Sequence, residues 1–144
     1  MPRARIICIG NPYHPADWVG PAVFAELGGM PLGTDVEVVD GGLHGLNLLC
    51  LLDGMERVVF ADTLLGDDEA PVDIAILEDP VAGHPALSFD HAGGLAFLLQ
   101  AAPLVQHPLP RMWVVGAPAG ADRALARPIA RNCLELAHGR AQPH

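Results

Sequence analysis

Lysine is absent from this sequence of 144 residues, so all eight basic side chains are arginine. Asp and Glu number 17, which gives a formal net charge of -9 at pH 7. An acidic surface repels phosphate backbones and anionic lipid surfaces, so we expect neither a nucleic acid nor a membrane as partner. Long hydrophobic runs are also absent, since none approaches the ~20 residues that a membrane-spanning helix needs.

The first ten residues contain a short apolar run, but they lack the small-residue cleavage site of a secretory signal peptide. The run ends instead at Gly10-Asn11-Pro12. We therefore expect it to be the first buried strand of a cytoplasmic protein.

Several signatures of known sites are missing. The three cysteines, Cys8, Cys50 and Cys133, are far apart and form no CxxC pair, which excludes a disulfide scaffold and a zinc-type site. We expect three buried, reduced thiols. The sequence contains no GxGxxG or GxxxxGK[ST] phosphate loop and no GxSxG serine motif. A nucleotide-binding enzyme and a serine hydrolase are therefore disfavoured.

Apolar residues make up 51% of the chain, and mean hydropathy is +0.31, which is enough for a folded core. Short apolar runs alternate with segments of helical periodicity, a pattern typical of an α/β protein. We predict a single domain, residues 1-144, with three α/β/α layers and about five mostly parallel strands. The short turn before the fourth strand also permits an antiparallel reversal there. The predicted strands are 5–9, 36–39, 57–61, 72–77 and 112–115, and the predicted helices are 17–27, 44–52, 88–100 and 122–137.

Parallel α/β sheets bind ligands at the carboxyl ends of their strands. Three polar residues stand at such positions: Asp17 after the first strand, Asp62 at the end of the third, and His91 at the start of the helix after the fourth. Two carboxylates and one imidazole suit a divalent-metal site with open positions, or an acid/base set. Each of the three could instead cap a helix or a turn.

Two further features lie near this edge. Asp40-Gly41-Gly42 follows the second strand and supplies backbone that a peptide or ligand could approach closely, or else a tight turn. His14 precedes Asp17 by three residues, and we expect it to be a solvated loop histidine.

Five blocks of this sequence, taken in order, resemble the nickel–iron hydrogenase maturation proteases. Each block alone is unspecific, and together they are fairly specific. They are ICIGNPYHPADWVG (7–20), VEVVDGG with HGL (36–46), RVVFADT (57–63), HAGGL (91–95) and WVVGAP (113–118).

The resemblance implies an aspartic-type, metal-dependent endopeptidase that removes the C-terminal peptide of a hydrogenase large-subunit precursor after nickel insertion. It implies that Asp17, Asp62 and His91 contact nickel supplied by the substrate, for recognition and as a Lewis acid. The family has no serine or cysteine nucleophile of its own. The backbone of Asp40, Gly41 and Gly42 would lie beside the substrate chain.

The sequence departs from the family pattern in two blocks. It has Ala16-Asp17-Trp18 where the family has D-[DE]-G, and Ala117 where an acidic or amide residue usually precedes the proline. Glycine often holds a backbone shape that tryptophan adopts less easily. A second hypothesis is therefore a divergent homologue that binds the nickel-loaded precursor without cutting it. A third, a flavodoxin-like small-molecule enzyme, lacks a phosphate-binding motif.

Overall fold

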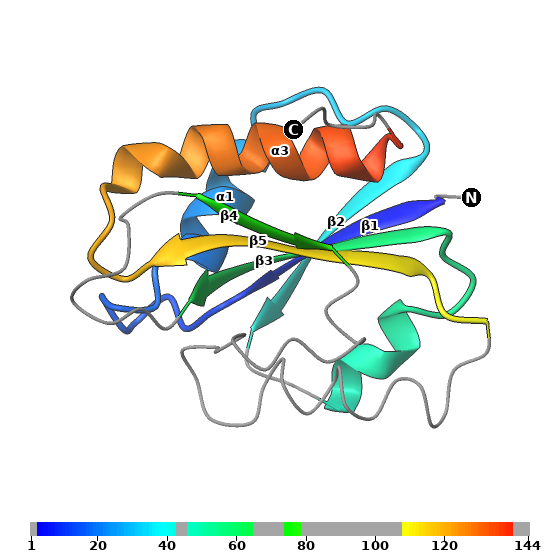
Figure 1. Ribbon diagram of the computed structural model, residues 1–144, viewed down its shortest axis with the longest axis horizontal. Helices are drawn as coiled ribbons and strands as arrows, with labels where there is room; N and C mark the ends of the chain where they lie inside the picture. The colour runs from blue at the N-terminus through cyan, green and yellow to red at the C-terminus, as the bar shows by residue number, and fades with distance from the viewer. Residues whose placement is uncertain (1–2, 43–45, 65–73, 79–107, 140–144) are drawn as a thin grey trace.

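A single five-stranded sheet organises the molecule (Figure 1). The computed structural model describes residues 3–42, 46–64, 74–78 and 108–139. The strand order is β2-β1-β3-β5-β4, and every neighbouring pair is parallel except β4 with β5. This confirms the predicted α/β fold with one antiparallel strand. The strands are β1 (Ala4–Ile9), β2 (Val36–Gly42), β3 (Arg57–Leu64), β4 (Ala75–Glu78) and β5 (Arg111–Pro118).

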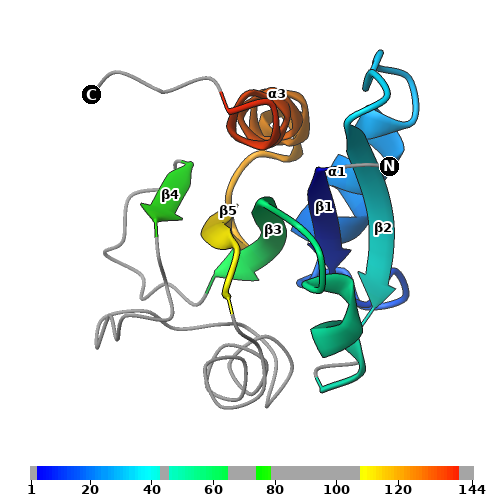
Figure 2. The ribbon, with the colours of Figure 1, turned by 90° about the vertical axis from the view of Figure 1, so that its right-hand side faces the viewer.

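Two helices, α1 (Val19–Leu27) and α3 (Ala126–Ala137), cover one face of the sheet. The 3-10 helix η1 (Leu46–Leu51) lies on the other face (Figure 2). Side chains of a strand alternate between the two faces, so each central strand contributes to two apolar clusters. Ile6 and Cys8 pack on the helix side, whereas Ile7 and Ile9 pack towards η1.

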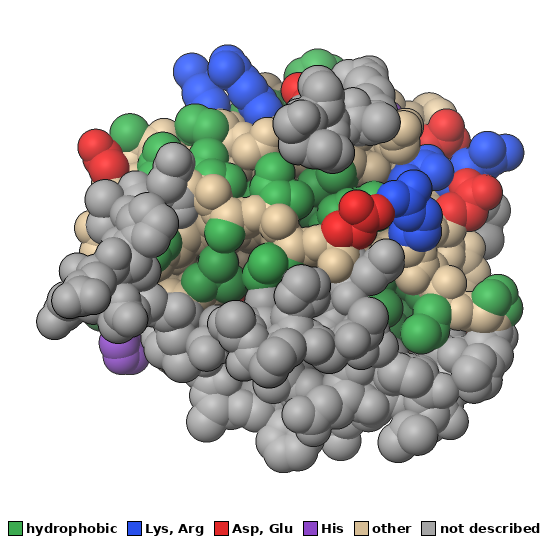
Figure 3. Space-filling model, in the orientation of Figure 1, with side chains coloured by type: hydrophobic (Ala, Val, Ile, Leu, Met, Phe, Trp, Pro, Cys, Tyr) green, Lys and Arg blue, Asp and Glu red, His purple; other side chains and the backbone are tan. Residues whose placement is uncertain are grey.

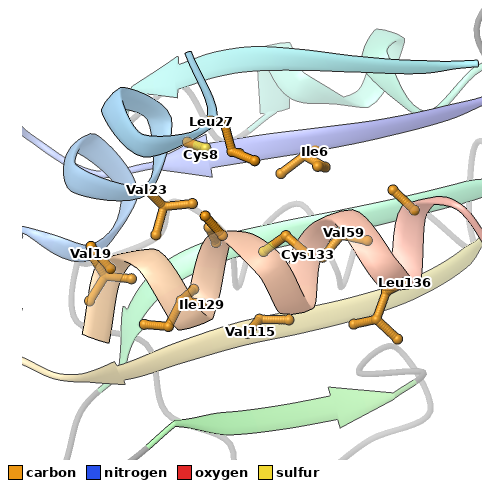
Figure 4. Close-up of a cluster of buried hydrophobic side chains, with 14 of the residues drawn as sticks. Ile6, Cys8, Val19, Val23, Leu27, Val59, Val115, Ile129, Cys133 and Leu136 are labelled. Carbon is orange, nitrogen blue, oxygen red and sulfur yellow. The ribbon is translucent and has the colours of Figure 1, made fainter. Parts of the chain in front are cut away.

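The larger cluster joins α1 and α3 to the sheet (Figure 4). Val19, Val23 and Leu27 are spaced so that one face of α1 is buried. The last helix follows the prediction closely, because Asp122 caps η3 (Arg123–Leu125), which leads directly into α3. Its Pro128 is tolerated in the first turn, where a backbone N–H has no intrahelical acceptor.

Several predicted boundaries were wrong. The second, third and fifth strands continue beyond their apolar cores, so Asp40 to Gly42 and Asp62 lie inside strands. The fourth strand, predicted over 72–77, is described from Ala75 to Glu78, and it is antiparallel to its neighbour β5. The predicted helix 44–52 is a 3-10 helix, and 3-10 geometry is usual for such short pieces. The predicted helix 88–100 lies outside the described residues.

The cysteine prediction holds for two of three residues. Cys8 and Cys133 are buried, but Cys50 on η1 is exposed. Burial, reinforced by the negative charge of Asp40, raises the pKa of Cys8 to about 12. Burial, and then the neighbouring Cys8, raise the pKa of Cys133 well above its ordinary value.

The β4 edge of the sheet combines apolar and charged side chains (Figure 3). Ile76 is exposed there, and Glu78 forms an ion pair with Arg111. The Arg111 guanidinium lies 4.8 Å from the centre of the Trp113 ring. In the described part of the chain, no helix is long and apolar enough to cross a membrane.

Candidate active site at the carboxyl ends of β1 and β3

The strand order predicts that a ligand binds at the carboxyl ends of β1 and β3. From β1 the chain passes through α1 to β2 on one side, whereas β3 pairs with β1 on the other. Ligands of open α/β sheets bind where the strand order reverses in this way. Asp17 lies just after β1 and Asp62 near the end of β3, so both predicted carboxylates lie at the carboxyl ends of two neighbouring strands.

Asp17 is held in the turn between β1 and α1. Its side chain is buried, with 6% of the residue exposed, and its Oδ2 accepts a hydrogen bond from the Asn11 backbone N–H at 2.8 Å. The Asp17 backbone N–H donates to the His14 carbonyl at 2.9 Å. The carboxylate therefore organises its own turn, as the capping alternative predicted.

Asp62 is fully buried in β3. Its Oδ1 accepts a hydrogen bond from the backbone N–H of Thr63 at 2.8 Å. Strand alternation places Asp62 on the face of Phe60 and Thr63 on the face of α1. The Thr63 hydroxyl oxygen accepts a bond from the Val19 backbone N–H at 3.1 Å. Thr63, which directly follows Asp62, is thus bonded to the start of α1, the helix that follows Asp17.

Glycines allow the backbone to close around the two acids. A Cβ on Gly10 would lie 2.7 Å from Pro21 Cδ and 3.2 Å from Asp17 Oδ1. A Cβ on Gly20 would lie 2.0 Å from the Ile9 carbonyl oxygen, so α1 starts directly against β1. Gly116 pairs with Asp62 across β3 and β5, and a Cβ there would lie 2.0 Å from the Asp62 carbonyl oxygen.

The Asp40-Gly41-Gly42 segment forms the irregular end of β2. Cys8 pairs with Asp40 but Ile9 pairs with Gly42, so Gly41 is the extra residue of a bulge. The Gly42 carbonyl accepts a bond from the Gly10 N–H at 3.1 Å, and Gly42 has a φ of 56°. Gly10 therefore lies between this segment and Asp17.

A cleft of about 270 Å³ lies next to Asp17. Asn11, His14, Trp18 and Arg123 contribute to its walls. His14 is exposed, as predicted, and its Nδ1 accepts a bond from the Ala16 N–H at 3.2 Å. A cleft of this size beside a buried carboxylate can receive a side chain of a bound polypeptide.

The third predicted site residue, His91, lies outside the described residues, so its placement stays a prediction. Within residues 3–42, 46–64, 74–78 and 108–139, no three His, Cys, Asp or Glu side chains gather into a metal site. Of the three residues predicted to bind a metal, the structure describes Asp17 and Asp62, whose carboxylate oxygens are of a type that divalent metals accept.

Sequence reasoning missed the residues that support the two acids. Thr63 stood in a quoted block, but its role as acceptor for the α1 N-terminus depends on a contact 44 positions away in the chain. The same holds for Arg123, whose guanidinium donates to the Pro15 carbonyl. No local pattern identifies such partners.

No protein-family model matches the sequence, and no curated protein matches it. Solved structures do match over nearly the whole chain. The hydrogenase maturating endopeptidase HybD from E. coli has a TM-score of 0.75 and 21% identity, over 95% of this chain and 93% of that one. An endopeptidase from Escherichia coli, solved in solution, has a TM-score of 0.69 and 22% identity, with coverages of 89% and 88%.

An archaeal structure is similar in the same way. The [NiFe] hydrogenase maturation protease HycI from Thermococcus kodakarensis has a TM-score of 0.68 and 17% identity, over 94% of this chain and 92% of that one. Similarity at these identities concerns the arrangement of strands and helices. This chain therefore has the fold of the solved hydrogenase maturation endopeptidases.

Proposed function

We propose that this chain is an endopeptidase that removes the C-terminal peptide of a nickel–iron hydrogenase large-subunit precursor after nickel insertion. Residues 1-144 act as a single domain in this proposal. The observation that carries it is the pair of buried carboxylates, Asp17 and Asp62, at the point where the strand order reverses. The near-complete overlap with solved hydrogenase maturation endopeptidases supports the same reaction class.

In this proposal Asp17, Asp62 and His91 contact the nickel that the precursor brings. Carboxylate oxygens and an imidazole nitrogen are ligands that nickel accepts. The nickel marks a precursor that is ready to be cut, and as a Lewis acid it can polarise the scissile carbonyl. Burial and the hydrogen bonds from the Asn11 and Thr63 backbone N–H groups restrain the Asp17 and Asp62 carboxylates, which supports a role in positioning a bound group.

The backbone of Asp40, Gly41 and Gly42 is proposed to lie beside the precursor chain. The bulge at Gly41 interrupts the ladder to β1, and the Asp40 carboxylate accepts the Gly42 N–H at 3.1 Å. A strand end without bulky side chains lets a second backbone approach closely. We also place this protein in the cytoplasm, where it would encounter the precursor.

A non-cutting, binding-only homologue is the second candidate. It rested on Ala16 and Trp18, which stand where the resembled motif has an acidic residue and a glycine. Trp18 has φ -92° and ψ -19°, which any residue adopts, so the glycine-to-tryptophan change does not strain the turn. Two observations in favour of binding alone remain: Ala16, where the resembled motif has an acidic residue, and Ala117, a buried apolar residue where the family usually has an acidic or amide one.

The test follows release of the C-terminal peptide by mass spectrometry, with nickel-loaded and nickel-free precursor in parallel. We expect cleavage of the nickel-loaded form alone. Asp62→Asn and His91→Ala should leave it uncut, because each removes a proposed nickel contact. Asp62→Asn does so at nearly constant side-chain shape. Asp53→Asn is the matched control, since Asp53 is exposed and precedes the amino end of β3, the opposite edge from the site.

Three outcomes separate the hypotheses. Cleavage by wild type and Asp53→Asn, but not by Asp62→Asn, supports the endopeptidase. A stable complex with the nickel-loaded precursor and no released peptide supports the binding-only homologue. Equal cleavage by all variants would falsify the role of Asp62 and His91.

A further inference from the structure

Trp18 connects the turn that carries Asp17 to the segment that follows β5, at the same carboxyl edge of the sheet. Only 4% of Trp18 is exposed, and its indole N–H donates to the Ala119 carbonyl oxygen at 2.8 Å. Ala119 directly follows β5, and it lies 101 positions from Trp18 in the chain. The ring is therefore fixed by packing and by a satisfied N–H, which a buried indole requires.

Arg123 holds the other side of the same turn. Its Nη2 donates to the Pro15 carbonyl oxygen at 2.9 Å, and its guanidinium carbon lies 5.9 Å from the centre of the Trp18 ring. A guanidinium over an indole face is a favourable cation–π arrangement. Pro15 and Trp18 flank Ala16 and Asp17, so the two contacts enclose the acid between them.

We infer that Trp18 and Arg123 are positioning residues for Asp17. They tie residues 15 and 18 to the segment that follows β5, while the Asn11 N–H holds Asp17 Oδ2. The tryptophan that replaces the motif's glycine then helps to hold Asp17 in place. The inference goes beyond the proposed function, and only its kinetic readout rests on that function.

The variant that tests the inference is Arg123→Ala, with Arg127→Ala as its matched control. Both arginines are exposed, and both reach from the last helical segment towards the first. Arg127 Nε lies 3.3 Å from Glu26 Oε1, near the opposite end of α1 from the Asp17 turn. The control therefore removes the same charge and a comparable contact without touching residues 11–18.

Amide hydrogen exchange provides a readout that does not depend on activity. Arg123→Ala should accelerate exchange of the Asn11 and Asp17 amides, whose acceptors lie within the turn, and Arg127→Ala should not. Trp18→Phe keeps an aromatic ring, though a smaller one, and removes the indole N–H, and we expect it to accelerate exchange of the same amides. Unchanged exchange in both Arg123→Ala and Trp18→Phe would overturn the inference.

Kinetics with nickel-loaded precursor provide the second readout. A loosened Asp17 should lower kcat by about tenfold while KM stays within about twofold, because a small misplacement of a reacting group lowers the rate steeply. Arg123→Lys, which can still donate to Pro15, should recover part of kcat. A tenfold loss shared by Arg127→Ala would point to general destabilisation and overturn the inference. If the wild type cuts no precursor, the proposed function fails, and hydrogen exchange alone decides the inference.

Discussion

Thr63 Oγ1 accepts the backbone N–H of Val19 at 3.1 Å, and this bond joins the end of β3 to the start of α1. The first N–H groups of a helix have no intrahelical acceptor. Trp18, at the N-cap of α1, makes no side-chain cap of its own. A threonine from a strand therefore caps α1, and the same residue holds Asp62 Oδ1 through its backbone N–H.

Replacing the Thr63 hydroxyl should therefore weaken the site and the fold together. We expect Thr63→Val to lower the free energy of unfolding by about 2 kcal/mol, because the shape is kept while a buried N–H loses its acceptor. Urea denaturation measures the loss. Thr63→Ser keeps the hydroxyl, so the Val19 amide should stay slow to exchange in Thr63→Ser and become fast in Thr63→Val. Equal exchange in the two variants would contradict this role.

Gly116 should tolerate no side chain. A methyl group there would meet the Asp62 carbonyl oxygen at 2.0 Å, which is backbone and cannot rotate away. We expect Gly116→Ala to lower the free energy of unfolding by about 2 kcal/mol or more. Gly120→Ala is the control, since a Cβ added there would have no atom beyond its chain neighbours within 4 Å. It should change the free energy of unfolding by less than about 0.5 kcal/mol. Similar thermal midpoints for both variants would refute the close approach.

The three thiols should differ sharply in reactivity. The thiolate is the reactive form, and burial raises the pKa of Cys8 to about 12, so Cys8 and Cys133 stay protonated and inaccessible at pH 8. Cys50 is exposed. Iodoacetamide should modify Cys50 alone in native protein and all three cysteines in denaturant, as peptide mass spectrometry can measure. Rapid native labelling of Cys133 would contradict its burial.

Stability should fall in alkaline solution partly because of these thiols. An unfolded Cys8 loses its proton near its ordinary pKa of 9.0, whereas the folded thiol keeps it until about 12. The folded state then binds more protons in this window, so the free energy of unfolding decreases as pH rises from 9 to 12. A Cys8→Ala/Cys133→Ala variant should show a shallower decrease. Parallel pH curves for the variant and the wild type would exclude the two thiols as the cause.

Local patterns were enough to predict the class of fold. Ile6 to Ile9, Val58 to Ala61 and Met112 to Val115 are continuous apolar runs, and strands buried on both faces require them. The alternation of these runs with helical segments predicted a mostly parallel sheet. The position of Asp62 near the end of β3 follows from the same run.

The strand order and the strand ends depended on distant partners. β5 lies between β3 and β4, and it extends β3 as far as Leu64, opposite Pro118. The apolar run of β3 ends at Ala61, so nothing local marks the last three residues as strand. The leucine-rich segment of η1 resembles a helix in composition, but a piece this short is not stable as an α-helix by itself.

The supporting residues of the site, like the strand order, depend on distant partners and could not be predicted from local patterns. Chain topology predicted that Asp17 and Asp62 lie at the carboxyl ends of strands, and the structure confirms these positions, whereas their roles in the site stay predictions. Thr63, Trp18 and Arg123 were missed as supporting residues because their acceptors and donors lie 44 to 108 positions away.

The span of these bonds has a consequence for how the protein is made. Asp17 is synthesised well before the groups that hold its turn, because the Ala119 carbonyl and the Arg123 guanidinium lie 101 and 108 positions after the residues that they contact. A nascent chain that has not yet produced β5 and Arg123 lacks both contacts. The acid turn therefore reaches its final arrangement only after the segment that follows β5 has been synthesised, when the domain folds as a unit.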